Sequence, residues 1–79
     1  MSKAGVVLVH AHPLFRQGLR YHLSGHPDFR ITGEAGNGQQ AIQLVDYTDP
    51  DIVVIELDLP GVNGLEVARA IKRSHPNIG

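Results

Sequence analysis

The sequence predicts an α/β fold in which a parallel three-stranded sheet lies between two layers of helices. Two short apolar runs, at residues 6–9 and 52–55, suit strands that are buried on both faces. Between the predicted strands lie stretches with apolar residues three and four positions apart, which are typical of amphipathic helices. Right-handed crossovers restrict the topology. A central first strand then gives the order 2-1-3, with the first helix on one face and the other two on the opposite face.

The first strand is predicted at residues 6–9, and the first helix begins at Pro13, whose missing N–H is harmless in the first turn. Gly25 is the expected C-cap of this helix. One apolar stripe is predicted along it, made of Leu14, Phe15, Gly18, Leu19, His22 and Leu23.

The second strand, at residues 29–35, alternates apolar and polar side chains, which indicates a half-exposed position at the edge of the sheet. Asn37 and Gln40 resemble a capping box at the start of the second helix. The buried stripe of that helix is predicted to contain Ala41, Leu44, Val45 and Thr48.

The third strand, at residues 52–55, is apolar on both faces. Asn63 and Glu66 are predicted to cap the third helix, which ends near residues 74–77. The buried side chains of this helix are expected to be Leu65, Ala68 and Ile71.

Composition limits the possible functions. The chain has 79 residues, enough for a single small domain over residues 1–79. Seven basic and eight acidic residues give a net charge of −1, so binding of nucleic acid by this segment is not expected. The lack of cysteine excludes disulfides and thiolate metal sites. The apolar stretch near the start is too short for a membrane span, and we expect a cytoplasmic protein without a membrane partner.

Two loops are the predicted location of any functional site. In open α/β sheets, ligands bind beyond the carboxyl ends of the strands, next to the point where the strand order reverses. Here those ends carry the sequences HAHP, at residues 10–13, and ELDLPG, at residues 56–61. Glu56 therefore stands where such a fold places its chemistry.

Together with PLFRQGL and GEAGNGQQA, these loops resemble the receiver domain of bacterial two-component response regulators. The resemblance is to the subgroup in which a helix-turn-helix DNA-binding domain follows the receiver. It implies a flavodoxin-like fold of five βα units in strand order 2-1-3-4-5, of which the fourth and fifth are absent here. It also implies an activity, the acceptance of a phosphoryl group from a histidine kinase onto an aspartate with the help of magnesium.

The residues that would carry out this activity are replaced. The position of the family's phosphoacceptor is Glu56, and the two acids that hold magnesium fall on His10 and Ala11. His12 matches the subgroup but is not a metal ligand in it. Asp58 occupies a position where the family contributes a backbone carbonyl. The hydroxyl residue and the lysine of the family belong to the absent strands.

The chemical properties of the replacement residues also disfavour phosphorylation. Magnesium prefers oxygen ligands, and the side chains of His10 and Ala11 offer none. The extra methylene of Glu56 shifts its oxygens by roughly a bond length, and a misplacement of about 1 Å can reduce a rate about 100-fold. We therefore interpret Glu56 as a fixed negative charge that imitates a phosphorylated aspartate, with one charge in place of about two. His10 is its expected neighbour.

Two other kinds of site are compatible with the sequence. Residues 36–41 match the G-x-G-x-x-A outline of a dinucleotide fingerprint, but an ordinary strand-to-helix turn explains the same string. His10, His12 and Glu56 could form a metal site or a pH-sensitive pair, whereas the simpler expectation is a hydrogen bond or ion pair between His10 and Glu56. We expect no cofactor and no enzymatic activity.

The third strand is expected to be incompletely covered. Order 2-1-3 leaves the outer edge of the third strand unpaired and one of its faces uncovered. Two explanations stay open, a homo-oligomer built over this strand or a longer receiver whose remaining units supply the cover. Partners are thus the chain itself or another protein, and a histidine kinase only by resemblance. The predicted interface residues are Ile52, Val53, Val54 and Ile55.

Overall fold

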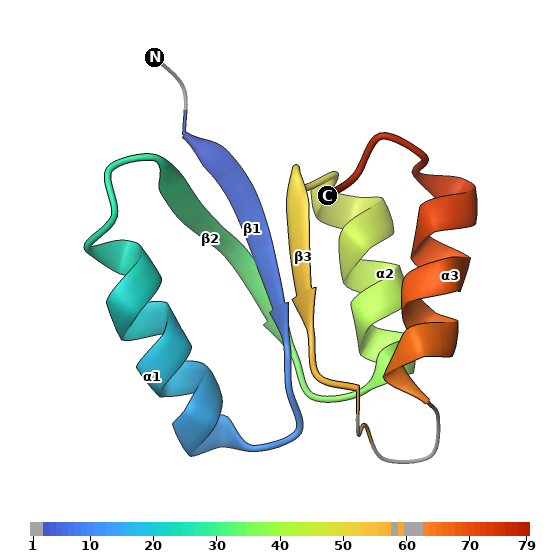
Figure 1. Cartoon of the computed structure of the whole chain (residues 1–79), viewed down its shortest axis with the longest axis horizontal. Coiled ribbons are helices and arrows are strands. Elements are labelled where there is room, and N and C mark those ends of the chain that lie inside the picture. Colours follow the sequence, from blue (N-terminus) through green and yellow to red (C-terminus); the bar gives the residue numbers. More distant parts are fainter. Residues whose placement is uncertain (1–2, 58, 60–62) are drawn as a thin grey trace.

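The structure, a computed structural model, describes residues 3–57, 59 and 63–79. The elements in chain order are β1 (Ala4–Val9), α1 (Pro13–Ser24), β2 (Phe29–Ala35), α2 (Gly38–Thr48), β3 (Ile52–Ile55) and α3 (Gly64–Ser74). Figure 1 shows the sheet between α1 on one side and the pair α2 and α3 on the other. Among the described residues, no helix has the length and apolar character needed to cross a membrane.

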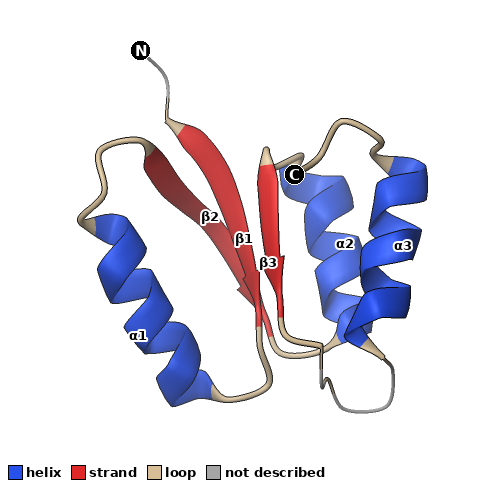
Figure 2. Ribbon diagram, in the orientation of Figure 1, coloured by secondary structure: helices blue, strands red, loops and turns tan. Residues whose placement is uncertain are grey.

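The sheet confirms the predicted topology. Its three strands are ordered β2-β1-β3, and β1 pairs in parallel with both neighbours (Figure 2). The four residues from Val6 to Val9 are at most 1% exposed, because β1 is central and is covered on both faces. Leu8 faces Val54 across the β1–β3 pair, and Val9 faces Ile55. This register fixes which residues meet where the two strands end.

The main core lies on the side of the sheet that α2 and α3 cover. Ala41 and Val45 of α2 are buried there, and Leu44 packs against them, as the sequence predicts. Asn37 caps α2, since its side-chain oxygen accepts a hydrogen bond of 2.9 Å from the N–H of Gln40. The cluster comprises Val7, Val9, Ala35, Ala41, Val45, Leu59, Val67, Ile71 and Ile78.

The predicted buried face of α3 is right for Ile71, which is buried, and wrong for Leu65. Asn63 does cap the helix, but its buried residues are Gly64, Val67 and Ile71, whereas Leu65 is 47% exposed. Residues 64, 67 and 71 lie on one side of a helix with 3.6 residues per turn, and this side packs against α2. Periodicity identified an amphipathic helix but not the side from which its partner approaches.

The stripe predicted for α1 is also wider than the real contact. None of the residues of α1 is buried, and only Arg16, Leu19 and Leu23 are partly covered. Leu14 is 82% exposed, and Phe15 and His22 are exposed as well. The helix contacts β1 and β2, and among the described residues no second helix packs beside it. The contact of α1 with the sheet is therefore limited to one narrow row of side chains.

The outer edge of β3 is not fully unpaired, which corrects the prediction. The N–H of Val53 donates to the carbonyl of Gly79 at 2.9 Å, and the N–H of Gly79 donates to the carbonyl of Asp51 at 2.8 Å. The end of the chain thus takes up part of this edge. The predicted uncovered face is present, because Val54 is 41% exposed on the side of the sheet where α1 lies.

Gly64 allows α3 to approach the end of β3. A Cβ atom at this position would overlap the carbonyl oxygen of Glu56 and would lie 2.6 Å from the Cα of Leu57. The N–H of Gly64 donates to the carbonyl of Leu57 at 2.8 Å. The first turn of α3 therefore rests directly on the backbone that carries Glu56, and only glycine fits.

We expect Gly64→Ala to lower the free energy of unfolding by about 1–3 kcal/mol, because the added methyl group must displace backbone. Gly18→Ala is the matched control, since Gly18 lies inside α1 with open space around it. That substitution should raise stability by roughly 0.5–1 kcal/mol through helix propensity. Urea unfolding of both variants measures the two effects, and equal effects of the two changes would contradict the close approach at Gly64.

Candidate functional site

The carboxyl ends of β1 and β3 bring His10 and Glu56 together. Because Val9 and Ile55 face each other in the sheet, the next residue of each strand emerges at the same level. The N–H of Glu56 donates to the carbonyl of Val9 at 2.9 Å, and the N–H of His10 donates to the carbonyl of Ala35 at 3.0 Å. Backbone pairing therefore continues to the two residues that the sequence singled out.

The side chain of His10 uses both ring nitrogens. Its Nε2 lies 2.9 Å from Oε2 of Glu56, and its Nδ1 accepts a hydrogen bond of 3.1 Å from the N–H of His12. A nitrogen that accepts carries no proton, so this geometry corresponds to the neutral imidazole with its proton on Nε2. The contact with Glu56 is then a hydrogen bond from a neutral donor to a carboxylate. His10 is only 7% exposed, so its Nε2–H has little access to water and depends on Glu56 as its acceptor.

An aromatic ring from α1 completes the surroundings of His10. The rings of Phe15 and His10 are stacked, with centroids 4.4 Å apart and planes 12° from parallel. The ring of His12 is tilted by 53° at a centroid distance of 5.4 Å. From the sequence, Phe15 is predicted to lie in the apolar stripe of this helix, and no contact with His10 is predicted. Its position five residues after a strand-end histidine, on the first turn of a helix, is the signal that would have indicated this contact.

The residues present do not fit a magnesium ion. Ala11 has no side-chain oxygen, and the imidazole of His10 offers nitrogen and is already engaged on both sides. Among the described residues, no group of three or more histidine, aspartate or glutamate side chains could hold a metal. Asp58, which the sequence places beside this site, lies outside the described residues.

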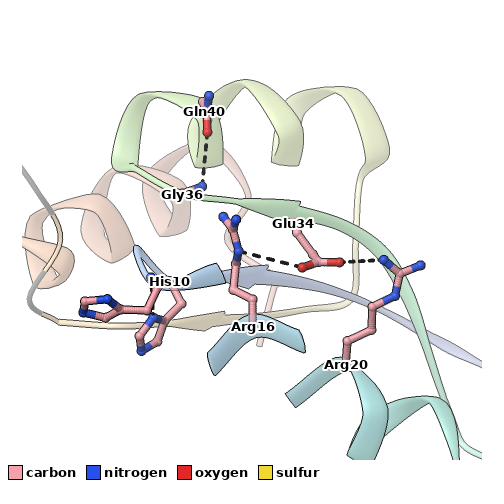
Figure 3. Close-up of polar contacts among 7 residues, drawn as sticks. His10, Arg16, Arg20, Glu34, Gly36 and Gln40 are labelled. Atoms are coloured by element: carbon pink, nitrogen blue, oxygen red, sulfur yellow. Dashed lines mark hydrogen bonds and ion pairs between the residues drawn. The ribbon is translucent and has the colours of Figure 1, made fainter. Parts of the chain in front are cut away.

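The glycine-rich turn after β2 is satisfied internally. The N–H of Gly36 donates to the side-chain oxygen of Gln40 at 3.1 Å (Figure 3). The expected capping box thus differs in one bond, since Gln40 reaches Gly36 and not Asn37. β2 is an edge strand, as predicted. The groups that a dinucleotide phosphate would need are therefore partly occupied by the helix cap.

Beside the site, two arginines of α1 share one carboxylate of β2 (Figure 3). Arg20 Nη1 lies 2.8 Å from Oε2 of Glu34, and Arg16 Nε lies 3.8 Å from Oε1 of the same side chain. The contact of Arg20 is a hydrogen bond, whereas Arg16 makes only a longer ion pair. Both contacts link α1 to β2.

Comparison with known proteins identifies a family. The model of the response regulator receiver domain matches residues 6–79. The nitrate/nitrite response regulator protein NarL of Escherichia coli (strain K12) is 43% identical over 63 residues, which are 80% of this chain and 29% of the relative. The transcriptional regulatory protein DegU of Brevibacillus brevis is 30% identical over 77 residues, 98% of this chain and 33% of the relative. The chain thus spans about a third of the length of these relatives.

Solved structures give the same result. A LuxR-family two-component response regulator from Aurantimonas sp. SI85-9A1 superimposes with a TM-score of 0.91 at 36% identity, over 98% of this chain and 55% of that one. The signal receiver domain of the putative response regulator NarL from Mycobacterium tuberculosis gives a TM-score of 0.88 at 35% identity, over 98% and 61%. The flavodoxin-like fold expected from the sequence is confirmed.

We expect Glu56→Ala to lower the free energy of unfolding by about 1–3 kcal/mol, because the buried Nε2–H of His10 loses its acceptor. Asp28→Ala is the control, since it removes a carboxylate that is also near a histidine but is exposed at the surface. Its effect should stay within about 0.5 kcal/mol. Denaturant unfolding at one fixed pH measures both, and a Glu56→Ala chain as stable as the Asp28→Ala chain would contradict the importance of the pair.

Proposed function

Because this chain belongs to the response regulator receiver domain family, we propose that it acts in signal transduction as a phosphorylation-independent protein-interaction module. Residues 1–79 would form a partial receiver domain in the cytoplasm. Glu56 would serve as a constant negative charge, and His10 would be the neighbour that fixes it. The observation that carries the proposal is the hydrogen bond between Nε2 of His10 and Oε2 of Glu56.

The chemistry of the site argues against phosphoryl transfer. That reaction relies on positioning and on a metal ion that neutralises the developing charge. A neutral imidazole stands at one of the two positions where the family has metal-binding acids, and an alanine stands at the other. Phosphoryl transfer would also have to break the contact between His10 and Glu56, which leaves a buried donor unsatisfied.

The same contact supports a role as a permanent signal. The side chain of Glu56 is 35% exposed, so a partner protein can reach its carboxylate. One of its oxygens lies 2.9 Å from Nε2 of His10, and this contact restricts the rotamers of the side chain. A partner would read a charge in a fixed place whether or not a kinase is active. A kinase partner rests on family resemblance alone.

The uncovered face of β3 is the proposed site of self-association. Val54 and Leu57 are exposed near the carboxyl end of β3, on a chain with an otherwise ordinary surface charge. Gly79 already pairs with Asp51 and Val53, which leaves less edge for strand pairing between two copies. We therefore favour packing of two faces over pairing of two edges. The proposed interface residues on this face are Ile52 and Val54, of which Val54 is the more exposed. The sequence also predicts Val53 and Ile55, but these side chains pack against the core on the side of α2 and α3.

Two alternatives follow from specific observations. The relatives include proteins described as transcriptional regulators, so the chain could be the receiver part of a longer DNA-binding regulator. Alternatively, the contacts of His10 with His12 and with Glu56 allow a switch driven by a proton. A metal-driven switch through the same three residues is not supported, since no such group among the described residues could hold a metal. Acid titration followed by nuclear magnetic resonance tests this second alternative. A switch would shift amide signals far from the site together with the signals of His10, whereas a fixed charge leaves the distant amides unchanged.

We expect no phosphorylation of Glu56 when the chain is incubated with acetyl phosphate and magnesium, as judged by intact mass and by peptide mapping. The control is a rebuilt variant with His10→Asp, Ala11→Asp and Glu56→Asp, which restores three carboxylates at the family's acidic positions. We expect this variant to bind magnesium, seen as amide shifts around residues 10 and 56. Labelling of the natural chain at Glu56 would overturn the proposed function.

We expect the chain to form a dimer at high micromolar concentration and Val54→Glu to make it monomeric, because a buried charge without a partner opposes association. Tyr47→Glu serves as the control, since Tyr47 is an exposed apolar residue on α2, away from β3. Light scattering coupled to gel filtration gives both masses. A natural chain that stays monomeric across the concentration series would rule out the self-association.

A further inference from the structure

The orientation of His10 depends on more than its hydrogen bonds. Its Nδ1 accepts from the N–H of His12, and its Nε2 faces Glu56, so the ring is held at two points in its own plane. Neither hydrogen bond covers the face of the ring. That face is covered by Phe15, whose ring lies 4.4 Å away and 12° from parallel.

We infer that Phe15 is a positioning residue for His10, and that it acts by stacking on the imidazole so that Nε2 stays aimed at Glu56. This inference rests on the proposed function, in which Glu56 supplies the charge that a partner reads. It adds that the charge is fixed from α1 as well as from the two strands.

The exposure of Phe15 argues for this role. The residue is 56% exposed, although phenylalanine on an amphipathic helix usually turns to the core. Its neighbour Leu14 is 82% exposed, so the first turn of α1 contributes little to burial. The contact with His10 is the stacked ring contact that the structure assigns to Phe15. Burial of apolar surface thus does not account for its position, whereas stacking does.

The arrangement at the start of α1 points the same way. No side chain caps the helix at His12, and Pro13 occupies the first turn. The N–H of His12 is satisfied by the ring of His10, and Phe15 covers the same ring one turn later. The N-cap residue His12 and the first-turn residue Phe15 therefore both contact the ring of His10. This ring connects the start of α1 to Glu56, which follows β3.

Loss of the stack has a defined consequence. Without a partner on its face, the imidazole can rotate about its Cβ–Cγ bond, and a half turn puts ring carbons where the two nitrogens stood. The proton on Nε2 would then leave Glu56 more often and exchange with water. A leucine at position 15 would preserve an apolar side chain and the helix, but it has no ring to restrict this rotation.

The test uses the whole chain labelled with ¹⁵N, and it reads the imidazole signals of His10 by nuclear magnetic resonance. In the natural chain we expect the tautomer with the proton on Nε2 and slow exchange of that proton. In Phe15→Leu the exchange should become roughly 2- to 10-fold faster, a range that corresponds to the worth of an aromatic pair. Phe15→Tyr keeps the ring and should restore the natural rate.

Two controls separate positioning from a general effect on folding. Leu14→Ala, in the same turn, should leave the signals of His10 unchanged, and the amide spectrum of each variant reports whether α1 is intact. In the natural chain the protons of the His10 ring should also show the upfield shift of a stacked ring, which needs no variant. Absence of that shift, or a Phe15→Leu chain with the natural exchange rate, would overturn the inference. Phosphorylation of Glu56 would refute the proposed function and leave the stacking result standing.

Discussion

The pairing of β1 with β3 is the constraint on which the rest of this structure depends. The alignment of β1 with β3 directs Val53 and Ile55 toward the core on the side of α2 and α3, so a slip by one residue would turn these side chains away from the core. That alignment sets Val9 opposite Ile55 and so delivers His10 and Glu56 to one place. Gly64 then lets α3 rest on the backbone of Glu56. The site follows from the core and not from the loops.

This origin explains why the polar groups of the site are already paired. A carboxylate at the tip of a buried strand needs a partner, and here the partner is a buried imidazole whose second nitrogen is occupied by the backbone of His12. A cation that entered would have to displace a satisfied donor. The family uses this position for reversible chemistry, whereas the groups present here favour one arrangement. A constant signal is what such a pair can provide.

Sequence patterns predicted the strands, their order, the caps at Asn37 and Asn63, and the meeting of His10 with Glu56. These features depend on neighbours in the chain or on the direction of parallel strands. The patterns failed for Leu65 and Leu14, because periodicity does not say from which side a helix is approached. They also missed the bonds between Gly79 and the edge of β3, and the stack of Phe15 on His10, since contacts between distant segments leave no local signal.

The partial cover of β3 bears on how a partner would bind. The carbonyl of Gly79 accepts from the outward N–H of Val53, and the N–H of Gly79 donates to the outward carbonyl of Asp51, so this one residue already pairs with part of the edge. What stays open is the face that carries Val54, on the side where α1 makes only one line of contact. Association over this surface would bury the side chain of Val54, which is 41% exposed. A partner that covers β3 would therefore also lie beside Glu56, which directly follows this strand, so the proposed interface and the proposed charge belong to one surface.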